Sequence, residues 1–282
     1  MSIRLMQKAL TTYFPGRSLF LGIMLIISLL PLLWTVLASL NVIPDNVSTP
    51  PTWHSNPSLD RYLEVGNTES HFFVETLNSA ILAALTTLTT TTITFLGAYS
   101  IARSHFKGRN LLIQCFLILA SLPVISFLIP LRSTLDVLHL DDTFLGAMLS
   151  EAALYSPLAL YIFYGYLNQI SPEFEQAAHL DGATTLEILR HVVLPIAASG
   201  IAATAIIVFV LSWNQMLIPL VLTPRLATLP NAIIDVFSIQ RNLDWTTAAA
   251  ALVISLLPIG VFVAVAHRFL EQFSLVASQQ EG

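Results

Sequence analysis

Residues 169–195 read QISPEFEQAAHLDGATTLEILRHVVLP and separate two long apolar segments of the chain. A stretch of this length and patterning is unusual for a simple connector between helices. It contains two successive sets of helix start and stop signals, which predict two short helices joined by a tight turn. We therefore expect a helix-turn-helix that projects from the body formed by the apolar segments.

Five residues in this stretch indicate where the two helices begin and end. Pro172 suits the first position of a helix, because its missing N–H would be unpaired there in any case. Gly182 should end this first helix, since glycine adopts the left-handed conformation at little steric cost. Thr184 and Glu187 have the spacing of a capping box and should start the second helix. We expect that helix to end at Pro195, where the chain enters the next apolar segment.

The composition of the whole chain is that of a membrane protein. Of the 282 residues, 55% are apolar and 10% are charged, whereas an average soluble domain carries about 25% charged residues. The mean hydropathy is +0.75, and several apolar runs exceed the roughly 18 residues that cross a bilayer. A net charge of −5 argues against a nucleic-acid partner, which would require a basic face. Cys115 is the only cysteine, so the chain can form neither an internal disulfide nor a cysteine-rich metal site.

Six apolar segments are long enough to cross a membrane. They lie at about 19–40, 75–101, 111–132, 144–168, 197–222 and 246–269. We therefore predict an all-α, polytopic membrane protein with six transmembrane helices, forming a single domain over residues 1–282. The first segment is too long for the h-region of a cleaved signal peptide. Prolines inside the segments favour kinks, and they are Pro31, Pro123, Pro130, Pro157, Pro219 and Pro258.

The distribution of basic residues predicts the orientation in the membrane. An even number of spans puts both termini on one side, together with loops 104–109 and 169–195. That side carries eight of the 12 lysines and arginines, and the opposite side, with loops 41–74 and 223–245, carries the other four. Because basic residues concentrate in cytoplasmic loops, we expect both termini to be cytoplasmic.

The 169–195 stretch also resembles a known motif. Residues 175–183 read EQAAHLDGA, and after a fixed interval residues 192–195 read VVLP. This pattern is similar to the EAA loop of ABC-importer permeases, in which E-A-A-x-x-x-G is followed by nine residues and then I-x-L-P. In that family the loop forms a coupling helix that docks on an ATPase subunit, so we call residues 169–195 the coupling loop. Gln176 stands where the family has its glutamate, and Glu175 lies one residue earlier.

The resemblance implies a set of residues that couple the chain to an ATPase. They are Glu175, Gln176, Ala177, Ala178, Asp181, Gly182, Ala183, Leu194 and Pro195. Four further features resemble the maltose-type carbohydrate permeases of the same superfamily: residues 59–62, residues 78–79, residues 102–103 before 106–108, and residues 213–214. Together they cover nearly the whole chain.

The resemblance further implies a fold, a function and partners. The fold would be that of a type I ABC importer permease in the bacterial plasma membrane, and the solute a sugar or related polyhydroxyl compound. The partners would be a second homologous permease, two ATPase subunits, a substrate-binding protein outside and the lipid bilayer. ATP and Mg would be bound by the ATPase subunits. We expect no cofactor or metal in this chain and no bond chemistry, since the sequence contains no P-loop and no hydrolase or zinc-protease motif.

Polar residues inside the spans are candidates for the translocation path. Glu151 is ionisable and therefore a functional candidate, unless it is hydrated near the outer interface or paired with Arg132. Tyr155 offers an aromatic face and a hydroxyl, which suit a sugar ring. The threonine-rich stretch 86–94 suits tight packing between helices better than a polar lining. The predicted path residues are Glu151, Tyr155, Ser212, Trp213, Asn214 and Gln215.

Two other classes of protein remain as alternatives. A secondary transporter or channel driven by an ion gradient would need ionisable residues near the middle of the membrane, and only Glu151 approaches this description. An intramembrane enzyme would need a paired His/Asp or Ser/His set within the spans, and the sequence offers none.

Overall fold

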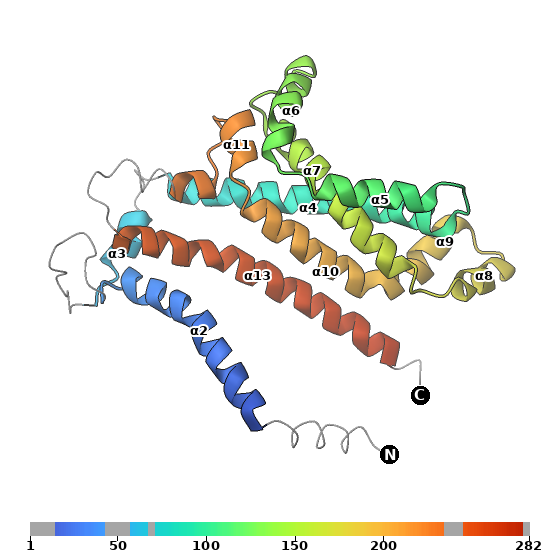
Figure 1. Cartoon of the computed structure of the whole chain (residues 1–282), viewed down its shortest axis with the longest axis horizontal. Helices are drawn as coiled ribbons and strands as arrows, with labels where there is room; N and C mark the ends of the chain where they lie inside the picture. The colour runs from blue at the N-terminus through green and yellow to red at the C-terminus, as the bar shows by residue number, and fades with distance from the viewer. Residues whose placement is uncertain (1–14, 43–56, 67–70, 234–244, 279–282) are drawn as a thin grey trace. The chain divides into compact units, whose positions relative to one another are not determined.

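The computed structural model describes residues 15–42, 57–66, 71–233 and 245–278, and every regular element in these ranges is helical (Figure 1). The chain divides into two compact units, which we describe separately: residues 1–70 with 236–254, and residues 71–235 with 255–282. Parts of the predicted outer loops, residues 43–56 and 67–70 of 41–74 and residues 234–244 of 223–245, lie outside the described residues.

The described part of the first unit contains two helices and the beginning of a third. These are α2 (Pro15–Ser39), α3 (Asp60–Val65) and the first residues of α13 (Trp245–Ser278). The hydroxyl groups of Ser39 and Tyr62 lie 2.6 Å apart and join α2 to α3. Thr247 donates a hydrogen bond of 3.3 Å to Glu64 and joins α3 to α13. Most large apolar side chains of α2 are exposed, as expected for a helix that faces lipid or another chain.

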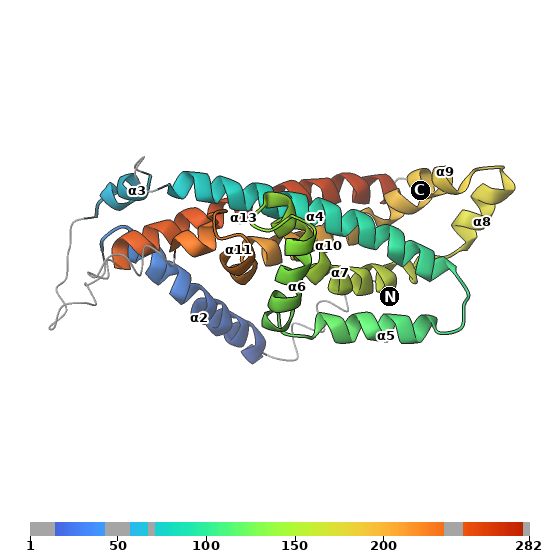
Figure 2. The ribbon, with the colours of Figure 1, turned by 90° about the horizontal axis from the view of Figure 1, so that it is seen from above.

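The second unit is built around three long helices. They are α4 (Phe72–Arg103), α7 (Phe144–Leu167) and α10 (Leu194–Trp213), and they pack against one another, side by side in both ribbon views (Figures 1 and 2). Small side chains such as Ala83, Ala147 and Ala159 are fully buried between them, which lets the backbones approach closely. The threonines of α4 are mostly buried as well, and those at 91 and 94 donate to carbonyl oxygens of their own helix.

Among the described residues, five helices are long and apolar enough to cross a membrane, and a sixth candidate is a bent pair. The five are Leu19–Ser39, Phe72–Arg103, Phe144–Leu167, Thr185–Trp213 and Thr246–Ala266. They correspond to five of the six predicted spans, which confirms the all-α membrane fold.

The third predicted span, 111–132, is not one continuous helix, and this expectation is corrected. The chain forms α5 (Arg109–Ala120) and α6 (Ile125–Val137), which meet at an angle of 99°. Pro123 lies in the break between them. A proline disfavours the helical conformation of the residue before it, so the sequence had signalled a kink here but not a turn this sharp.

The fifth predicted span, 197–222, also has different boundaries. The helix begins at Thr185 and ends at Trp213, and a separate short helix, α11 (Leu217–Leu222), follows. At the break, the side chain of Asn214 donates to the carbonyl of Val210 at 2.7 Å. The side-chain oxygen of Gln215 accepts from the backbone N–H of Leu217 at 3.1 Å. Polar side chains therefore add hydrogen bonds to the backbone groups on either side of the break.

Loops assigned to the same side of the membrane meet within the second unit. Asp142, before α7, forms an ion pair of 3.1 Å with Arg225, after α11. Asn78 on α4 donates a hydrogen bond of 3.0 Å to the carbonyl of Ala227. At the other end of the unit, α8 (Glu173–Leu180) lies beside the end of α4 (Figure 1). The unit therefore has two distinct ends, as the predicted topology requires.

Candidate functional site: the coupling loop

The first half of the coupling loop folds as the sequence predicts. Helix α8 (Glu173–Leu180) begins one residue after Pro172, and the Ser171 hydroxyl accepts a hydrogen bond of 3.3 Å from the Glu173 N–H. Gly182 ends the turn with a φ of +85°. Its N–H donates to the carbonyl of residue 179, and the N–H of residue 183 donates to the carbonyl of residue 178, both at 3.0 Å. This pair of hydrogen bonds is a Schellman motif, the termination that glycine favours.

The second half begins as predicted but ends differently. Thr184 caps α9 (Thr185–Ile188) and forms a reciprocal capping box with Glu187. The chain then continues through a π-helical turn, η2 (Leu189–Val193), directly into α10. The expected end at residues 194–195 is therefore wrong. Pro195 has no N–H, and its ring clashes with the carbonyl four residues earlier in a regular α-helix. The wider π-helical turn before it lets the helix continue.

The coupling loop has an inner and an outer side. The inner side includes Ile188 and Val193, which are buried in one core cluster with residues of α4, α5 and α7. On the outer side, Phe174, Leu180 and Leu186 are large apolar side chains that are exposed, Leu180 at 89%. An apolar outer side on a rigid frame is typical of a docking surface for another protein.

The predicted ATPase-coupling residues divide between these two sides. Gln176, Ala177, Asp181, Gly182, Leu194 and Pro195 are exposed. Ala178 and Ala183 are half-buried and pack against the core cluster. Glu175 is buried, with 8% of its surface exposed, and is the only buried residue of α8.

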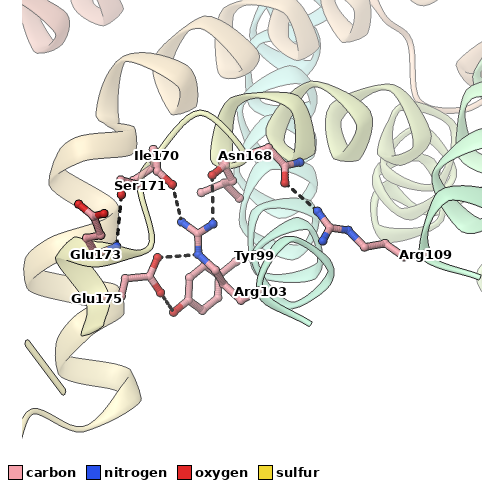
Figure 3. Close-up of polar contacts among 9 residues, drawn as sticks. Tyr99, Arg103, Arg109, Asn168, Ile170, Ser171, Glu173 and Glu175 are labelled. Atoms are coloured by element: carbon pink, nitrogen blue, oxygen red, sulfur yellow. Dashed lines mark hydrogen bonds and ion pairs between the residues drawn. The ribbon is translucent and has the colours of Figure 1, made fainter. Parts of the chain in front are cut away.

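The carboxylate of Glu175 points inward and is fully engaged (Figure 3). Its Oε1 accepts a hydrogen bond of 2.6 Å from Nε of Arg103, with which it forms an ion pair. Its Oε2 accepts a hydrogen bond of 2.8 Å from the hydroxyl of Tyr99. The two amino groups of the Arg103 guanidinium donate to the carbonyls of Leu167 and Ile170, at 3.3 and 3.4 Å. Arg103 therefore joins α4 to both α8 and the end of α7.

Tyr99 and Arg103 were missed as functional residues by the sequence analysis. Arg103 was noted only as part of a resemblance to carbohydrate permeases. One signal could have indicated both: the spacing of four residues places them on one face of the last turns of a helix. The partner on the coupling loop is 72 residues from Arg103 along the chain, which no local pattern reveals.

A second arginine lies at the same end of the unit but makes separate contacts. Arg109, at the start of α5, donates from a terminal nitrogen to Oδ1 of Asn168 at 2.7 Å (Figure 3). Its Nε donates to the hydroxyl of Tyr164 at 2.8 Å. Its guanidinium also lies 4.9 Å from the centre of the Tyr164 ring, in a cation–π arrangement. Arg109 thus holds α5 against α7.

Four of the six predicted path residues come together in two contacts, which join α7 to the end of α10 and the residues that follow it. Glu151 is completely buried, and its Oε2 accepts hydrogen bonds from the hydroxyls of Ser212 and of Thr86, the latter at 3.4 Å. Tyr155 donates to the carbonyl of Leu211 at 3.1 Å and accepts from Nε2 of Gln215 at 2.9 Å.

The two alternatives for Glu151 are both corrected by the structure. It does not lie exposed at the outer interface, since none of its surface is accessible. It does not pair with Arg132, which instead donates to the carbonyl of Val221 at 2.8 Å. Of the remaining path candidates, Trp213 is buried and stacks on Phe209, with ring centres 6.1 Å apart. Asn214 is exposed.

Comparison with known proteins identifies the family. Residues 93–274 match the family described as binding-protein-dependent transport system inner membrane component. The chain is 28% identical over 266 residues to the sulfoquinovosyl glycerol transport system permease SmoH of Agrobacterium fabrum, covering 92% of both chains. It is 31% identical over 252 residues to the trehalose/maltose transport system permease MalG of Thermococcus litoralis, covering 88% of this chain and 90% of that one.

A solved structure shares the fold. A chain of a bacterial ABC transporter involved in the import of the acidic polysaccharide alginate superposes with a TM-score of 0.70 at 19% identity, covering 95% of this chain and 98% of that one. The protein therefore belongs to the family of inner membrane components of binding-protein-dependent transport systems, and it has the fold of a type I ABC importer permease.

Proposed function

We propose that this chain forms one half of the transmembrane path of an ATP-driven importer for a sugar or related polyhydroxyl solute. The proposal is supported by the family and by the named solutes of its relatives, which are sulfoquinovosyl glycerol for SmoH and trehalose or maltose for MalG. The other half would be a second, homologous permease. Two ATPase subunits would bind ATP and Mg, and a soluble binding protein would deliver the solute from outside.

The coupling loop is the observation that carries this proposal. The side chains of Phe174, Leu180 and Leu186 are exposed on its surface. The Gly182 turn and the Thr184 capping box fix the backbone that carries them. Fully burying one such side chain against a partner contributes roughly 1.5–3 kcal/mol. Burial of these three side chains would contribute to holding an ATPase subunit at a defined place, against the cost of association.

The proposed mechanism is alternating access. Closure of the ATPase pair on ATP would move the two coupling loops, and the transmembrane halves would then turn to face the outside. ATP acts in this scheme because it binds the closed ATPase state better than the open one. The scheme places both termini, residues 104–109 and the coupling loop in the cytoplasm. The contacts of α7 with the end of α10, at Glu151 and Tyr155, lie beside the proposed path, and exposed Asn214 lines it.

The decisive test of the docking role substitutes Gly182, with a matched control. Gly182 and Gly108 both have positive φ, at +85° and +99°, and both have open space where a side chain would go. A β-branched side chain in this conformation costs about 1–2 kcal/mol from backbone sterics alone. We expect Gly182→Val to turn the docking surface and lose the ATPase subunits on co-purification. Gly108→Val, which lies outside the coupling loop, should retain them.

Equal retention of the ATPases by both variants would contradict the docking role of this loop.

The solute class is tested separately with the binding protein, by a thermal-shift screen of sugars, polyols and glycosides. A ligand at 100 times its dissociation constant raises the stability of that protein by about 2.7 kcal/mol. A response only to amino acids or ions would contradict the polyhydroxyl class.

A further inference from the structure

Two side chains of helix α8 face the rest of the protein, half-buried Ala178 and buried Glu175, and of these only Glu175 is polar. The helix has eight residues, and Glu175 is the only one that is buried. Its large apolar side chains at 174 and 180 are exposed, so they do not hold it to the core. The Glu175 carboxylate is therefore the main side-chain attachment of the helix that carries the docking surface.

Glu175 is held by two residues of α4, which restrain the orientation of α8 as well as its position. Tyr99 and Arg103 lie one helical turn apart on α4, and each binds a different oxygen of Glu175 (Figure 3). A single hydrogen bond would allow α8 to swing, whereas two at different oxygens restrain its rotation. Both partners of the ion pair are largely shielded from water, with 18% and 10% of their side chains exposed. Screening by solvent and salt is weak for such a pair.

Arg103 extends the same attachment to a second long helix. Its terminal nitrogens donate to the carbonyls of Leu167 and Ile170, where α7 ends and the chain leads to α8. The planar guanidinium can reach a carboxylate and two carbonyls at once, which an ammonium group cannot do. One side chain thus connects α8 with α4 and α7, the helices that pack together in the second unit.

We propose that Arg103 is the positioning residue through which motion of the docked α8 is passed to α4 and α7. This inference rests on the proposed function, because it assumes that an ATPase subunit moves α8. We call Tyr99, Arg103 and Glu175 together the joint. Gln176 is exposed and belongs to the docking surface. The joint would therefore serve transmission after docking, and the outer side of α8 would serve docking itself.

The proposal predicts that loss of the joint reduces the response to ATP and leaves ATPase binding intact. The test uses the complete transporter, purified with its ATPase subunits, in a Cys115→Ser background. A reporter cysteine is introduced by Asn214→Cys, at the exposed break after α10, and its rate of labelling by a maleimide is measured without nucleotide and with ATP, Mg and vanadate. Amounts of co-purified ATPase are measured in parallel as the readout of docking.

The main variant removes both charges of the joint, Arg103→Gln with Glu175→Gln, so that no buried charge is left unpaired. We expect the ATPases to remain bound, and the ATP-dependent change in labelling to fall by about five-fold or more, as expected when an ordinary allosteric coupling is lost. Arg103→Lys, which can keep the ion pair but not the bonds to both carbonyls, should restore part of the response. Tyr99→Phe should weaken the response less than the double variant.

Arg109→Gln is the matched control. It removes an arginine at the same end of the unit, whose hydrogen bonds within the described part of the chain go to Tyr164 and Asn168 and not to α8. We expect this variant to retain the full ATP response. An equal loss in Arg109→Gln and the double variant would overturn the proposal, since any loosening of this end would then suffice. An unchanged response in the double variant would overturn it as well.

Two further outcomes separate this proposal from the proposed function. If the double variant loses the ATPases while Arg109→Gln retains them, the pair holds the docking surface and does not transmit motion, and the inference is overturned. If the double variant fails to assemble, the ATP response of Arg103→Lys and Tyr99→Phe tests the inference. A full response in both variants overturns the inference. If the reporter does not respond to ATP even with the joint intact, the proposed function itself is contradicted.

Discussion

Two buried glutamates in the same unit have opposite surroundings. Glu175, in the coupling loop, has both carboxylate oxygens bound, one by the Arg103 guanidinium and one by the Tyr99 hydroxyl. Glu151, in α7, is completely buried and accepts only from the hydroxyls of Ser212 and Thr86, both at the same oxygen. Its Oε1 has no partner among the residues that the structure describes.

The difference shows that Glu175 is satisfied by contacts within the chain, whereas Glu151 is only partly satisfied. Removing a carboxylate from water is unfavourable unless it is paired and hydrogen-bonded. Glu175 meets that condition within its own chain, so its role is to attach α8. Glu151 has half of its accepting capacity unused at the point where α4, α7 and α10 meet. Such a group adds little to the stability of the isolated chain, which marks this region as a candidate for contacts made during transport.

The largest expected effect comes from breaking the paired site on one side only. Arg103→Gln leaves the Glu175 carboxylate buried without its cation, and removing one partner of a buried ion pair lowers stability by about 3–5 kcal/mol. Thermal unfolding of the permease–ATPase complex in lipid nanodiscs would measure the loss. Adding Glu175→Gln should recover much of it, because the unpaired charge is then gone. A double variant as unstable as Arg103→Gln alone would show that the charge pair is not the source.

The same neutral substitution at the two glutamates compares them directly. Glu175→Gln leaves the largely buried Arg103 guanidinium without its counter-charge, although the amide oxygen can still accept a hydrogen bond, and should lower stability by about 3 kcal/mol. Glu151→Gln keeps an oxygen that can accept from Ser212 and replaces a buried carboxyl group by an amide of the same size, so it should change stability by less than about 1 kcal/mol. Unfolding midpoints of the two variants, measured under one condition, test this order. A greater loss at Glu151 would mean that its environment in the assembled transporter is also fully paired.

The sequence predicts local structure here better than it predicts the joint. The Gly182 turn and the Thr184 capping box each depend on residues within a few positions of one another, and both are present. Their backbone requirements are met by particular residue types, so the pattern is visible without a structure. The contact between Arg103 and Glu175 depends instead on how α4 and α7 pack, and that packing is decided by many small and apolar residues together.

The membrane spans show the same limit. Hydropathy identified the apolar segments, because transfer into a bilayer depends on composition over about 20 residues. It could not distinguish a straight span from the 99° bend between α5 and α6, since both are equally apolar. It also placed the start of the fifth span at 197, because the helix from Thr185 begins with residues that belong to the coupling loop. The path candidates at 151 and 212 were each found separately, and only the structure shows that they touch.

Removal of one hydroxyl tests the second contact beside Glu151. Tyr155→Phe removes the donor to the Leu211 carbonyl and the acceptor for Gln215. A typical hydrogen bond contributes about 0.5–1.5 kcal/mol, so we expect a loss of stability of about that size. The unfolding midpoint in nanodiscs checks it, and Tyr161→Phe on the same helix, where the tyrosine is exposed, is the control. Equal losses in the two variants would show that the contact with Gln215 contributes nothing.

The smallest effect on stability is expected at Asn214, and it should come with a clear effect on transport. Asn214 is exposed, and its side chain donates only to the carbonyl of Val210 in its own helix. Asn214→Leu should therefore change the free energy of unfolding by no more than about 0.5 kcal/mol, as is usual for surface positions. If this residue lines the path, the same variant should lower uptake of the solute identified with the binding protein. ATPase binding should remain normal, because the coupling loop is unchanged. Normal uptake by a normally assembled variant would move the path away from the break after α10 and toward the buried contacts of Glu151 and Tyr155.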